Sequence, residues 1–588
     1  MTPAVVTFAE GSAGLAGTIA AALGAEVFAC GSDGLEAGTL LPRLFREGRP
    51  ILGICAAGIL IRVLAPYLAD KQAEPPVLAI SRDGVSVVPL LGGHHGANRL
   101  ARQVAEAIGG TAALTTASDI RFARGLDEPP AGWALGDPEG AKAAMAAALG
   151  GAAIALTGDA PWIAEAGYEI SPQGSIKVRA SERLDGDEGL VYRPQTLVAG
   201  IGAERGVAAG EVIELIEATL ASANLSPRSL AALATIELKA DETAFAAAAA
   251  YFDVPLRLFT AAELDEERDR LVHPSALVEA ETGTPGVAEA AALKAGTLIV
   301  PKRKSARATC AIGRASAPID AATFGRSRGA LHVVGVGPGD RASRTGAAVD
   351  ALGACTDWVG YGLYLDLVAD LRFGHVEHRF ALGNEEMRAR AALELAASGK
   401  TVALICSGDA QIYAMAALVY ELLEAEGARA VSANARRVEI AVHPGISAMQ
   451  AASAAAGALL GHDFCAISLS DLLTPASVIR KRLDAACRGD FVTALYNPRS
   501  ERRTALLAEA QAMFAASRPA DTPVVVARDL GRPGQRVEVT TIAGFDPASV
   551  DMLTIVVIGA STSRILTRGS GERLAYTPRG YAGKVAPP

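Results

Sequence analysis

A proline, an aspartate and three glycines lie at or just after the end of a short apolar segment near the middle of the chain. The segment is Leu331–Val336, and glycines alternate with other residues from its end as far as Asp340 (GVGPGD). We predict a buried strand that ends in a tight turn, because the apolar run stops at glycine and proline. Glycines leave the main chain open to close approach by a ligand, although an ordinary strand-to-loop turn has the same composition. The turn differs from the dinucleotide-binding pattern, since Asp340 takes the last glycine position and Pro338 lacks a backbone N–H.

Four later segments repeat this pattern of an apolar run followed by a turn of small or polar residues. They are Thr401–Cys406 before SGDA, Val438–Val442 before HPGISA, Phe491–Leu495 before YNP, and Leu553–Ile558 before GAS. In open α/β sheets, ligands bind at the carboxyl ends of the strands. The five turns therefore predict one binding site that is assembled from several loops, each positioned by a strand.

The N-terminal half carries two adjacent histidines, His94 and His95, in a glycine-rich loop (GGHHGAN). Imidazoles suit acid–base work near neutral pH, so this pair is a candidate for acting on a bound carbonyl or carboxylate. The alternative is a glycine-rich turn with solvent-exposed histidines. No acidic cluster adjoins the loop, so we predict no metal site.

The composition narrows the class of protein. The chain has 588 residues, half of them hydrophobic, and many of these are alanines in small-residue helices, which indicates several α/β domains. It has no long uncharged apolar run of the kind a transmembrane helix needs, and residues 11–30 lack the basic n-region of a signal peptide. Seven cysteines without C-x-x-C spacing suit the reducing cytoplasm. A net charge of −9 argues against nonspecific nucleic-acid binding.

Shifts in composition divide the chain into domains. Strands and alanine-rich helices alternate near both ends of the N-terminal half, whereas its middle is rich in turn residues, and a small, polar, proline-containing segment precedes Ala330. We predict an α/β domain over residues 1–125, a small domain over 126–195, an α/β domain over 196–315, a linker over 316–329, and a C-terminal half with domains over 330–443 and 444–588.

Taken in order, GVGPGD, SGDA, PGISA and YNP resemble the tetrapyrrole (corrin and porphyrin) methyltransferase family. The YNP loop and Arg528–Gly534 (RDLGRPG) are similar to its precorrin-3B C17-methyltransferase branch. This resemblance covers residues 330–583. It implies a two-domain α/β fold, S-adenosyl-L-methionine as cofactor, a tetrapyrrole substrate that is methylated at C17 with ring contraction, and a homodimer formed through this half.

The resemblance also implies roles for individual residues. Pro338 and Asp340 would shape the loop where the macrocycle lies, with Asp340 as the catalytic candidate. The implied cofactor-binding residues are Pro338, Ser407, Gly408, Asp409, Ile412, Ser447, Ala448 and Asn497. Asp409 has a second interpretation, compatible with the first, as the N-cap of a helix predicted over Gln411–Glu424.

Methyl transfer from a sulfonium is an in-line displacement, so the protein mainly aligns donor and nucleophile and excludes water. Neither a protein nucleophile nor a metal is needed. The implied substrate carries many carboxylates, so we expect cationic groups around the cleft. Arg528 and Arg532, on a glycine–proline loop after a strand, are the substrate-binding candidates. The run Arg480–Arg482 is more typical of a solvated helix face.

Five motifs of the N-terminal half together resemble the CbiG family of cobalt-precorrin-5A hydrolases: ILGICAAGI, GGHHGAN, VAGIGAERG, IELKADE and VAEAAAL…LIVPKRK. This resemblance spans residues 51–314 and implies opening of a ring lactone with release of a two-carbon fragment. His94 and His95 are the catalytic candidates, followed by the charged residues Lys239, Glu242 and Glu289.

The N-terminal half departs from the family pattern in two places. The histidine loop has one glycine fewer than is usual, and Ala203 and Glu204 stand where cysteine or arginine is usual. One alternative is therefore an N-terminal half that binds the corrinoid without catalysis. Another is a C-terminal half that methylates uroporphyrinogen or RNA.

Overall fold

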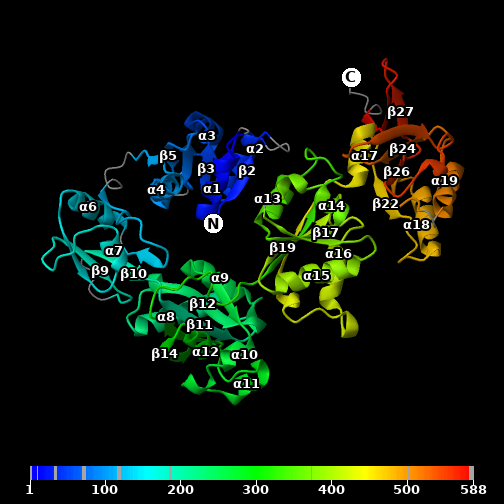
Figure 1. Ribbon diagram of the computed structural model, residues 1–588. Helices are drawn as coiled ribbons and strands as arrows, with labels where there is room; N and C mark the ends of the chain where they lie inside the picture. Colours follow the sequence, from blue (N-terminus) through cyan, green and yellow to red (C-terminus); the bar gives the residue numbers. More distant parts are fainter. Residues whose placement is uncertain are drawn as a thin grey trace, which may run out of the picture. The chain divides into compact units, whose positions relative to one another are not determined.

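The computed structural model describes residues 3–8, 11–31, 36–68, 74–114, 121–136, 138–184, 189–372, 374–500 and 504–581, with the main chain alone at 94, 138 and 139. Two compact units, Met1–Arg328 and Gly329–Pro588, make up the chain (Figure 1). Helices and strands alternate in both units, which confirms the predicted multidomain α/β fold class. Within these described ranges, no helix is both long and apolar enough to cross a membrane.

The first unit begins with a six-stranded sheet in the order β2-β1-β3-β4-β5-β6. Strands β1 to β4 are parallel to one another, β5 is antiparallel to β4, and β6 is parallel to β5. Helices α1 and α4 pack on one face through small and aliphatic residues such as Ile19 and Val104. The elements are β1 (Ala4–Thr7), α1 (Ala13–Leu23), β2 (Glu26–Ala29), α2 (Ala37–Arg46), β3 (Ile51–Ile54), α3 (Ala57–Leu64), β4 (Val77–Ile80), β5 (Ser86–Leu91), α4 (Ala97–Ile108) and β6 (Thr111–Ala112).

A small four-stranded sheet follows, in the order β7-β10-β9-β8. Aromatic residues fill its core, where the ring of Trp162 meets that of Tyr192 edge to face at 4.9 Å. The Tyr192 hydroxyl donates to the carbonyl of Leu126 at 2.5 Å, so this buried phenol is satisfied. The elements are β7 (Trp133–Leu135), α6 (Pro138–Leu149), β8 (Ile154–Thr157), α7 (Pro161–Glu165), β9 (Ile176–Ala180) and β10 (Leu190–Pro194).

The third sheet of this unit has the order β13-β12-β11-β15-β14. Strands β11, β12 and β13 are parallel, whereas β15 is antiparallel to both β11 and β14. Helices α8 and α9 cover one face, and α12 lies so close to the other that only glycine fits at Gly200. The elements are β11 (Leu197–Ala203), α8 (Ala209–Ser222), β12 (Leu230–Ile236), α9 (Thr243–Phe252), β13 (Leu256–Phe259), α10 (Ala261–Asp265), α11 (Ala276–Thr282), α12 (Val287–Leu293), β14 (Thr297–Lys304) and β15 (Ala308–Arg314).

The segment predicted as a linker, residues 316–329, packs on this third sheet. The Ile319 N–H donates to the carbonyl of Gln195 at 2.9 Å, and Arg326 forms a β-bridge with Leu258. Phe324 meets Phe259 edge to face at 5.4 Å. Most of this polar stretch therefore belongs to the first unit.

The second unit begins with a fully parallel sheet in the order β18-β17-β19-β16-β20. Helices α15 and α16 pack on one face, and α13 and α14 on the other. Because every strand runs in the same direction, all five carboxyl ends lie at one edge. The elements are β16 (Ala330–Gly335), α13 (Gly346–Ala354), β17 (Asp357–Tyr361), α14 (Gly362–Asp366), β18 (Val376–Phe380), α15 (Glu385–Ala397), β19 (Thr401–Cys406), α16 (Ala416–Glu424) and β20 (Glu439–His443).

The predicted fourth and fifth strands form part of a separate mixed sheet, in the order β22-β23-β26-β24-β25, with a three-stranded sheet, β21-β28-β27, beside it. Helix α17 packs on one face of the mixed sheet, and α18 and α19 on the other. The elements are α17 (Ala448–Ala456), β21 (Gly457–Ala458), β22 (Phe464–Ser468), α18 (Ala476–Arg488), β23 (Val492–Tyr496), α19 (Ala505–Ser517), β24 (Pro523–Arg528), β25 (Arg536–Thr541), β26 (Thr554–Ile558), β27 (Arg564–Thr567) and β28 (Arg573–Tyr576).

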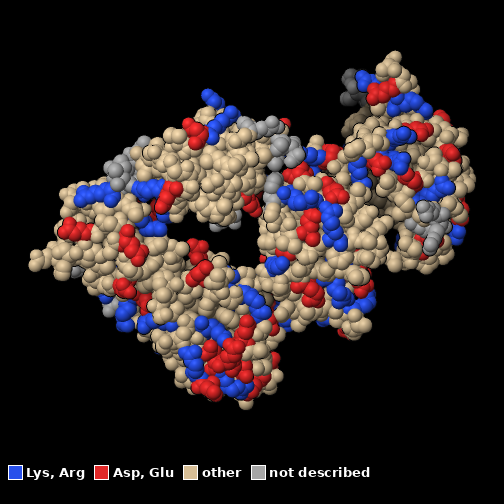
Figure 2. Space-filling model, viewed as in Figure 1, with Lys and Arg blue, Asp and Glu red and all other residues tan. Residues whose placement is uncertain are grey.

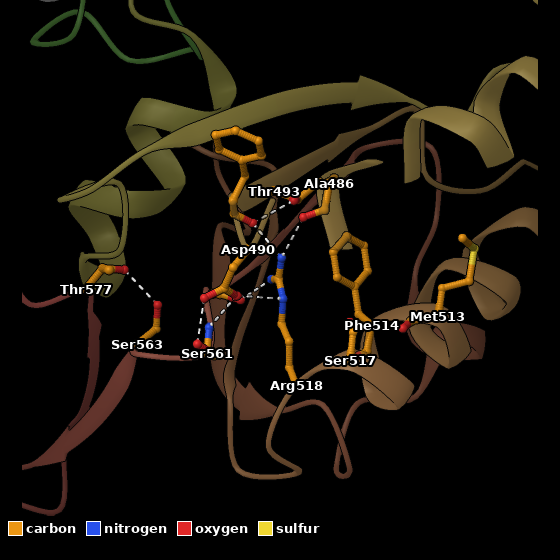
Figure 3. Close-up of polar contacts among 12 residues, drawn as sticks. Ala486, Asp490, Thr493, Met513, Phe514, Ser517, Arg518, Ser561, Ser563 and Thr577 are labelled. Atoms are coloured by element: carbon orange, nitrogen blue, oxygen red, sulfur yellow. Dashed lines mark hydrogen bonds and ion pairs between the residues drawn. The ribbon is translucent and has the colours of Figure 1, made fainter. Parts of the chain in front are cut away.

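A buried arginine at the end of α19 holds the edge of this mixed sheet together (Figure 3). The Arg518 guanidinium lies over the Phe514 ring, with its central carbon 4.5 Å from the ring centre, and pairs with Asp490 at 3.4 Å. Asp490 in turn accepts hydrogen bonds from the N–H and hydroxyl of Ser561 at 2.8 and 2.6 Å. Arg518 also donates to the carbonyls of Ala486, Phe491 and Gly559.

The turn predicted after the fifth strand, residues 559–561, contacts this arginine and its partner Asp490. Strand β26 is antiparallel to β23, so its carboxyl end lies at the opposite edge of the sheet from that of β23. The prediction that this turn joins the other four at one site is therefore wrong. The turn meets the Arg518 cluster instead.

Candidate active site

A cavity of about 320 Å³ opens in the second unit where the two five-stranded sheets meet. Loops from the carboxyl ends of all five strands of the parallel sheet contribute to it. The mixed sheet adds the carboxyl ends of β23 and β24 and the beginning of β26. The lining residues are Pro338, Tyr361, Leu363, Tyr364, Leu382, Ser407, Gly408, Asp409, Ile412, Tyr413, Ser447, Ala448, Tyr496, Asn497, Ala527, Asp529, Leu530, Arg532, Met552, Leu553, Thr554 and Ile555.

The cavity brings together most of the candidates singled out from the sequence. All eight cofactor-binding candidates line it, from Pro338 in the first loop to Asn497 after β23. Arg532 also lines it, whereas Asp340 and Arg528 do not. Nine predicted residues thus lie around one space, eight of them implied by the family resemblance, although those after β23 and β24 reach it from the second sheet.

Glycines join the loops behind the cavity. Gly337 and Gly408 exchange backbone hydrogen bonds of 3.1 and 2.8 Å. A Cβ on Gly335 would lie 2.7 Å from the Gly408 oxygen and 2.9 Å from the Gly445 nitrogen. We name these four residues the glycine junction. Main chain from neighbouring loops, and not only a ligand, is what approaches these glycines.

Asp409 links two of these loops. Its carboxylate accepts from the Gln411 N–H at 2.8 Å and from the Gly445 N–H at 3.1 Å, and the residue is 9% exposed. The helix predicted to begin at Gln411 begins at Ala416 instead, and its N-cap is Met415. The N-cap interpretation of Asp409 is therefore wrong, because residues 410–415 form bends and not a helical turn. The carboxylate closes a local turn and reaches across to the next loop.

Ser447 does cap a helix. Its hydroxyl accepts from the Gln450 N–H while the Gln450 side chain accepts from the Ser447 N–H, which is a capping box at the start of α17. That helix follows β20 of the parallel sheet and packs on the mixed sheet. Ser447 therefore fixes the crossing between the two sheets at the cavity wall.

Arg532 connects the glycine–proline loop to the other two turns. Its Nε donates to the carbonyl of Pro338 at 3.1 Å, and one terminal nitrogen donates to the Ser407 hydroxyl at 3.1 Å. The other terminal nitrogen has no partner among the described residues. It is therefore available to a ligand in the cavity.

Asp340 and Arg528 have other partners. The Asp340 carboxylate accepts from the N–H and hydroxyl of Ser343 at 2.7 and 2.8 Å, which closes the loop that follows β16. The Arg528 side chain is 45% exposed and pairs with Asp551 at 2.9 Å. No local sequence pattern indicates this carboxylate partner, since Asp551 lies on a distant loop.

Tyrosines are the site residues that sequence reasoning missed. Tyr361 ends β17 and Tyr364 lies in α14 directly after it, where residues 360–362 (GYG) have the same turn composition as the other strand ends. Burial raises the pKa of Tyr364 and Tyr496, so both stay neutral near pH 7. Tyr413 and two polar lining residues, Asn497 and Asp529, have positive φ angles of 52°, 49° and 49°. Such conformations gather at functional sites, where the surrounding fold holds them.

This arrangement suits binding more than bond-making by the protein. A carboxylate, a hydroxyl, an amide and a guanidinium converge among tyrosine rings and aliphatic side chains, as in small-molecule sites. No group of three or more potential metal ligands occurs in the part of the chain that the structure describes.

The histidine loop of the first unit is a short 3-10 helix, η2 (Gly93–His95), between two left-handed glycines. Gly92 has φ 74°, and a Cβ there would lie 2.5 Å from the main chain of Pro75. The side chain of His94 lies outside the described atoms, and His95 is exposed directly before α4. The loop conformation thus requires glycine at its first position.

Comparison with known proteins gives three matches to family models. Residues 330–546 match the tetrapyrrole (corrin/porphyrin) methylases, residues 39–119 the N-terminal region of cobalamin synthesis G, and residues 197–313 its C-terminal region. The histidine loop lies in the second of these matches.

Similar proteins agree with the first match. A probable cobalt-factor III C(17)-methyltransferase of Salmonella typhimurium is 44% identical over 251 residues, covering 43% of this chain and 99% of the relative. A precorrin-3B C(17)-methyltransferase of Sinorhizobium sp is 42% identical over 257 residues, covering 43% and 98%. The crystal structure of the methyltransferase CobJ is 39% identical with a TM-score of 0.39, covering 42% of this chain and 100% of that one. The chain therefore belongs to the tetrapyrrole (corrin/porphyrin) methylase family, with cobalamin synthesis G domains fused ahead of its methylase domain.

Proposed function

We propose that the C-terminal half is an S-adenosyl-L-methionine-dependent methyltransferase of cobalamin biosynthesis. It would methylate C17 of precorrin-3B, or of its cobalt equivalent, with ring contraction. The observation that carries this proposal is the cavity at the carboxyl ends of the parallel strands, which all eight candidate cofactor residues line. The names of the two relatives supply the position of methylation.

The cavity residues fit the cofactor in size and chemistry. A space of about 320 Å³ is within the range of small-molecule sites. Asp409 and Asn497 offer oxygens to hydroxyl or amino groups, and the apolar wall offers contact to a flat base. When bound, the cofactor supplies the methyl group and its sulfonium leaving group. The protein's part is to hold the donor in line and keep water out.

The substrate contacts are part of the same proposal. The terminal nitrogen of Arg532 that has no partner among the described residues would bind a ring carboxylate. Asp340, held by Ser343, would shape the loop against which the macrocycle lies. The contact of this loop with the macrocycle makes Asp340 the catalytic candidate. Arg528, which already pairs with Asp551, is proposed to bind a substrate carboxylate outside the cavity lining.

Product analysis tests this half. The full chain is incubated with S-adenosyl-L-methionine and with metal-free or cobalt-loaded precorrin-3 substrate, and products are identified by mass spectrometry. One added methyl group at C17 is the expected result. Methylation of uroporphyrinogen or RNA instead would replace the proposal with another methylase of the same fold.

We further propose that the N-terminal half hydrolyses the lactone of cobalt-precorrin-5A and releases a two-carbon fragment. The two cobalamin synthesis G matches support this assignment. His94 or His95 would polarise the lactone carbonyl or transfer a proton. Binding of the corrinoid without lactone opening would leave this half as a binding module.

The proposal also covers the oligomeric state, the cellular compartment and the domain boundaries. The methyltransferase half forms a homodimer, which sedimentation at micromolar concentration tests. The protein acts in the cytoplasm, since all seven cysteines are free thiols. Apart from the predicted linker, most of which packs on the third sheet, the domains are those drawn from the sequence, which limited proteolysis of the full chain tests.

A further inference from the structure

A histidine and a buried glutamate form a pair in the domain built on the third sheet. Glu289 lies in the first turn of α12, and its side chain is 1% exposed. Its two oxygens accept from the backbone N–H groups of Val272, His273 and Lys302, each at 2.9 Å. One of them also contacts Nδ1 of His273 at 2.8 Å.

The carboxylate determines how the imidazole is presented. Burial by itself raises the pKa of Glu289, but the hydrogen bonds from His273 and from the three backbone groups outweigh it, and the pKa falls below its ordinary value. An ionised acceptor at Nδ1 keeps the proton on that nitrogen, so Nε2 carries the lone pair. The His273 side chain is 51% exposed, and its Nε2 has no partner among the described residues.

This pair lies where open sheets bind ligands. The carboxyl ends of β11, β12 and β13 share one edge, and the antiparallel pairing of β15 with β11 and β14 brings the carboxyl end of β14 to the same edge. Lys302, near the end of β14, donates from Nζ to the carbonyl of His273 at 2.6 Å. His273 is therefore positioned from two sides at the carboxyl edge.

The surroundings match an apolar ring that bears carboxylates. Val272 and Leu277, on either side of His273 in sequence, are 56% and 72% exposed. Lys302 and Lys304 supply cations from the end of β14. Acidic and basic side chains gather over α10 and α11 (Figure 2), and most of these pair with one another, as Arg268 does with Asp265 and Glu279. Apolar side chains thus lie on the segment that carries His273, and cations on the strand that holds its main chain.

We infer that His273 is the general base for lactone opening in the N-terminal half and that Glu289 is its positioning residue. Nε2 takes a proton from water as the water oxygen bonds to the lactone carbonyl carbon, and the carbonyl electron pair moves to its oxygen. The pair returns as the ring C–O bond breaks, and the imidazolium gives its proton to the departing alkoxide. Lactone and water thus become a hydroxy acid.

This inference rests on the proposed hydrolase function and adds to it. Opening a lactone requires a base for water and a group that polarises the carbonyl. With His273 as the base, proton transfer is assigned to the domain built on the third sheet and not to the histidine loop. A purely structural explanation is also available, since the three backbone hydrogen bonds to Glu289 would secure the loop and β14 without any catalysis.

The test compares variants of the full chain with cobalt-precorrin-5A as substrate. His273→Gln should lower lactone opening by about 10²–10⁴-fold, the usual contribution of a general base, while C17 methylation is unchanged. His273→Gly should regain turnover when imidazole is added, which a structural role does not predict. His462→Gln is the matched control, because His462 is 55% exposed and contacts Asp463 at 3.4 Å in the other unit.

Glu289→Gln should lower kcat with little change in KM, since the residue acts through His273. Lactone opening at the parent rate in His273→Gln, or no recovery of His273→Gly by imidazole, would overturn the inference and leave the hydrolase proposal intact. A parent enzyme that methylates at C17 but opens no lactone would overturn both. Thermal unfolding at the parent temperature would establish that the His273 variants are folded.

Discussion

Replacing Asp409 by alanine separates binding from loop structure at the cavity. The change removes two hydrogen bonds to a carboxylate, from Gln411 at 2.8 Å and from Gly445 at 3.1 Å. Hydrogen bonds to charged groups contribute about 1.5–3 kcal/mol each. Water in the cavity can reach the freed N–H groups, so we take the lower value for each and expect the free energy of unfolding to fall by about 3 kcal/mol.

The affinity for the cofactor should fall as well. Loss of a hydrogen bond from the ligand to a buried carboxylate costs about 1–3 kcal/mol, which corresponds to about 5- to 150-fold weaker binding. Calorimetry with S-adenosyl-L-methionine measures the affinity of the full chain, and urea unfolding measures its stability. Both quantities are needed, because a loosened loop also weakens binding.

Two more variants complete the experiment. Asp409→Asn keeps one acceptor oxygen but turns an NH₂ group toward an N–H donor, so its stability should lie between those of the parent and the alanine variant. Asp484→Asn removes a carboxylate that is 51% exposed on α18 and should change neither quantity. An alanine variant that is destabilised but binds the cofactor as the parent does would refute the cofactor role. Unchanged stability would refute the loop-tying geometry.

Other substitutions test other parts of the molecule. Arg532→Ala removes two hydrogen bonds and a free donor at the cavity, so kcat/KM for the tetrapyrrole should fall by about 10- to 100-fold, and an unchanged value would exclude a carboxylate contact. Arg518→Met leaves three carbonyls and Asp490 without their partner, so urea unfolding should show a loss of about 3 kcal/mol or more; a smaller loss would mean that water replaces the guanidinium. His94→Gln and His95→Gln should each be tested for lactone opening, where loss of a polarising group lowers the rate by about 10²–10³-fold; parent rates in both would make the loop structural.

Strand positions could be predicted because their signal is local. The strand predicted at Leu331 begins one residue earlier, at Ala330, and Thr401–Cys406 is correct at both ends. A buried apolar run that stops at glycine or proline leaves little freedom in where the strand ends. The nine candidate residues around the cavity follow such strand ends, which is why they lie close together.

Strand direction and partners could not be predicted in this way. The run Leu553–Ile558 has the same composition as the parallel strands, yet β26 is antiparallel to its neighbours. Its amino end reaches the cavity, and its carboxyl turn meets Arg518. Likewise, Arg528 pairs with the carboxylate of Asp551, and no local sequence pattern predicts a contact between those two loops.

The glycine junction distinguishes residues of the methyltransferase half that cannot be substituted from residues of the cavity wall that can. At Gly335 and Gly445 any side chain would collide with neighbouring main chain, so the close contacts within the glycine junction are made by peptide groups, and the Asp409 carboxylate adds one side-chain link to Gly445. Peptide groups are the same whatever the side chains around them. Randomising the tyrosines and aliphatic residues of the cavity wall would therefore alter what is accepted there without dismantling the junction. A library of variants could therefore keep Gly335 and Gly445 and vary the residues of the cavity wall. Variants that accept new acceptor molecules could then be selected from it.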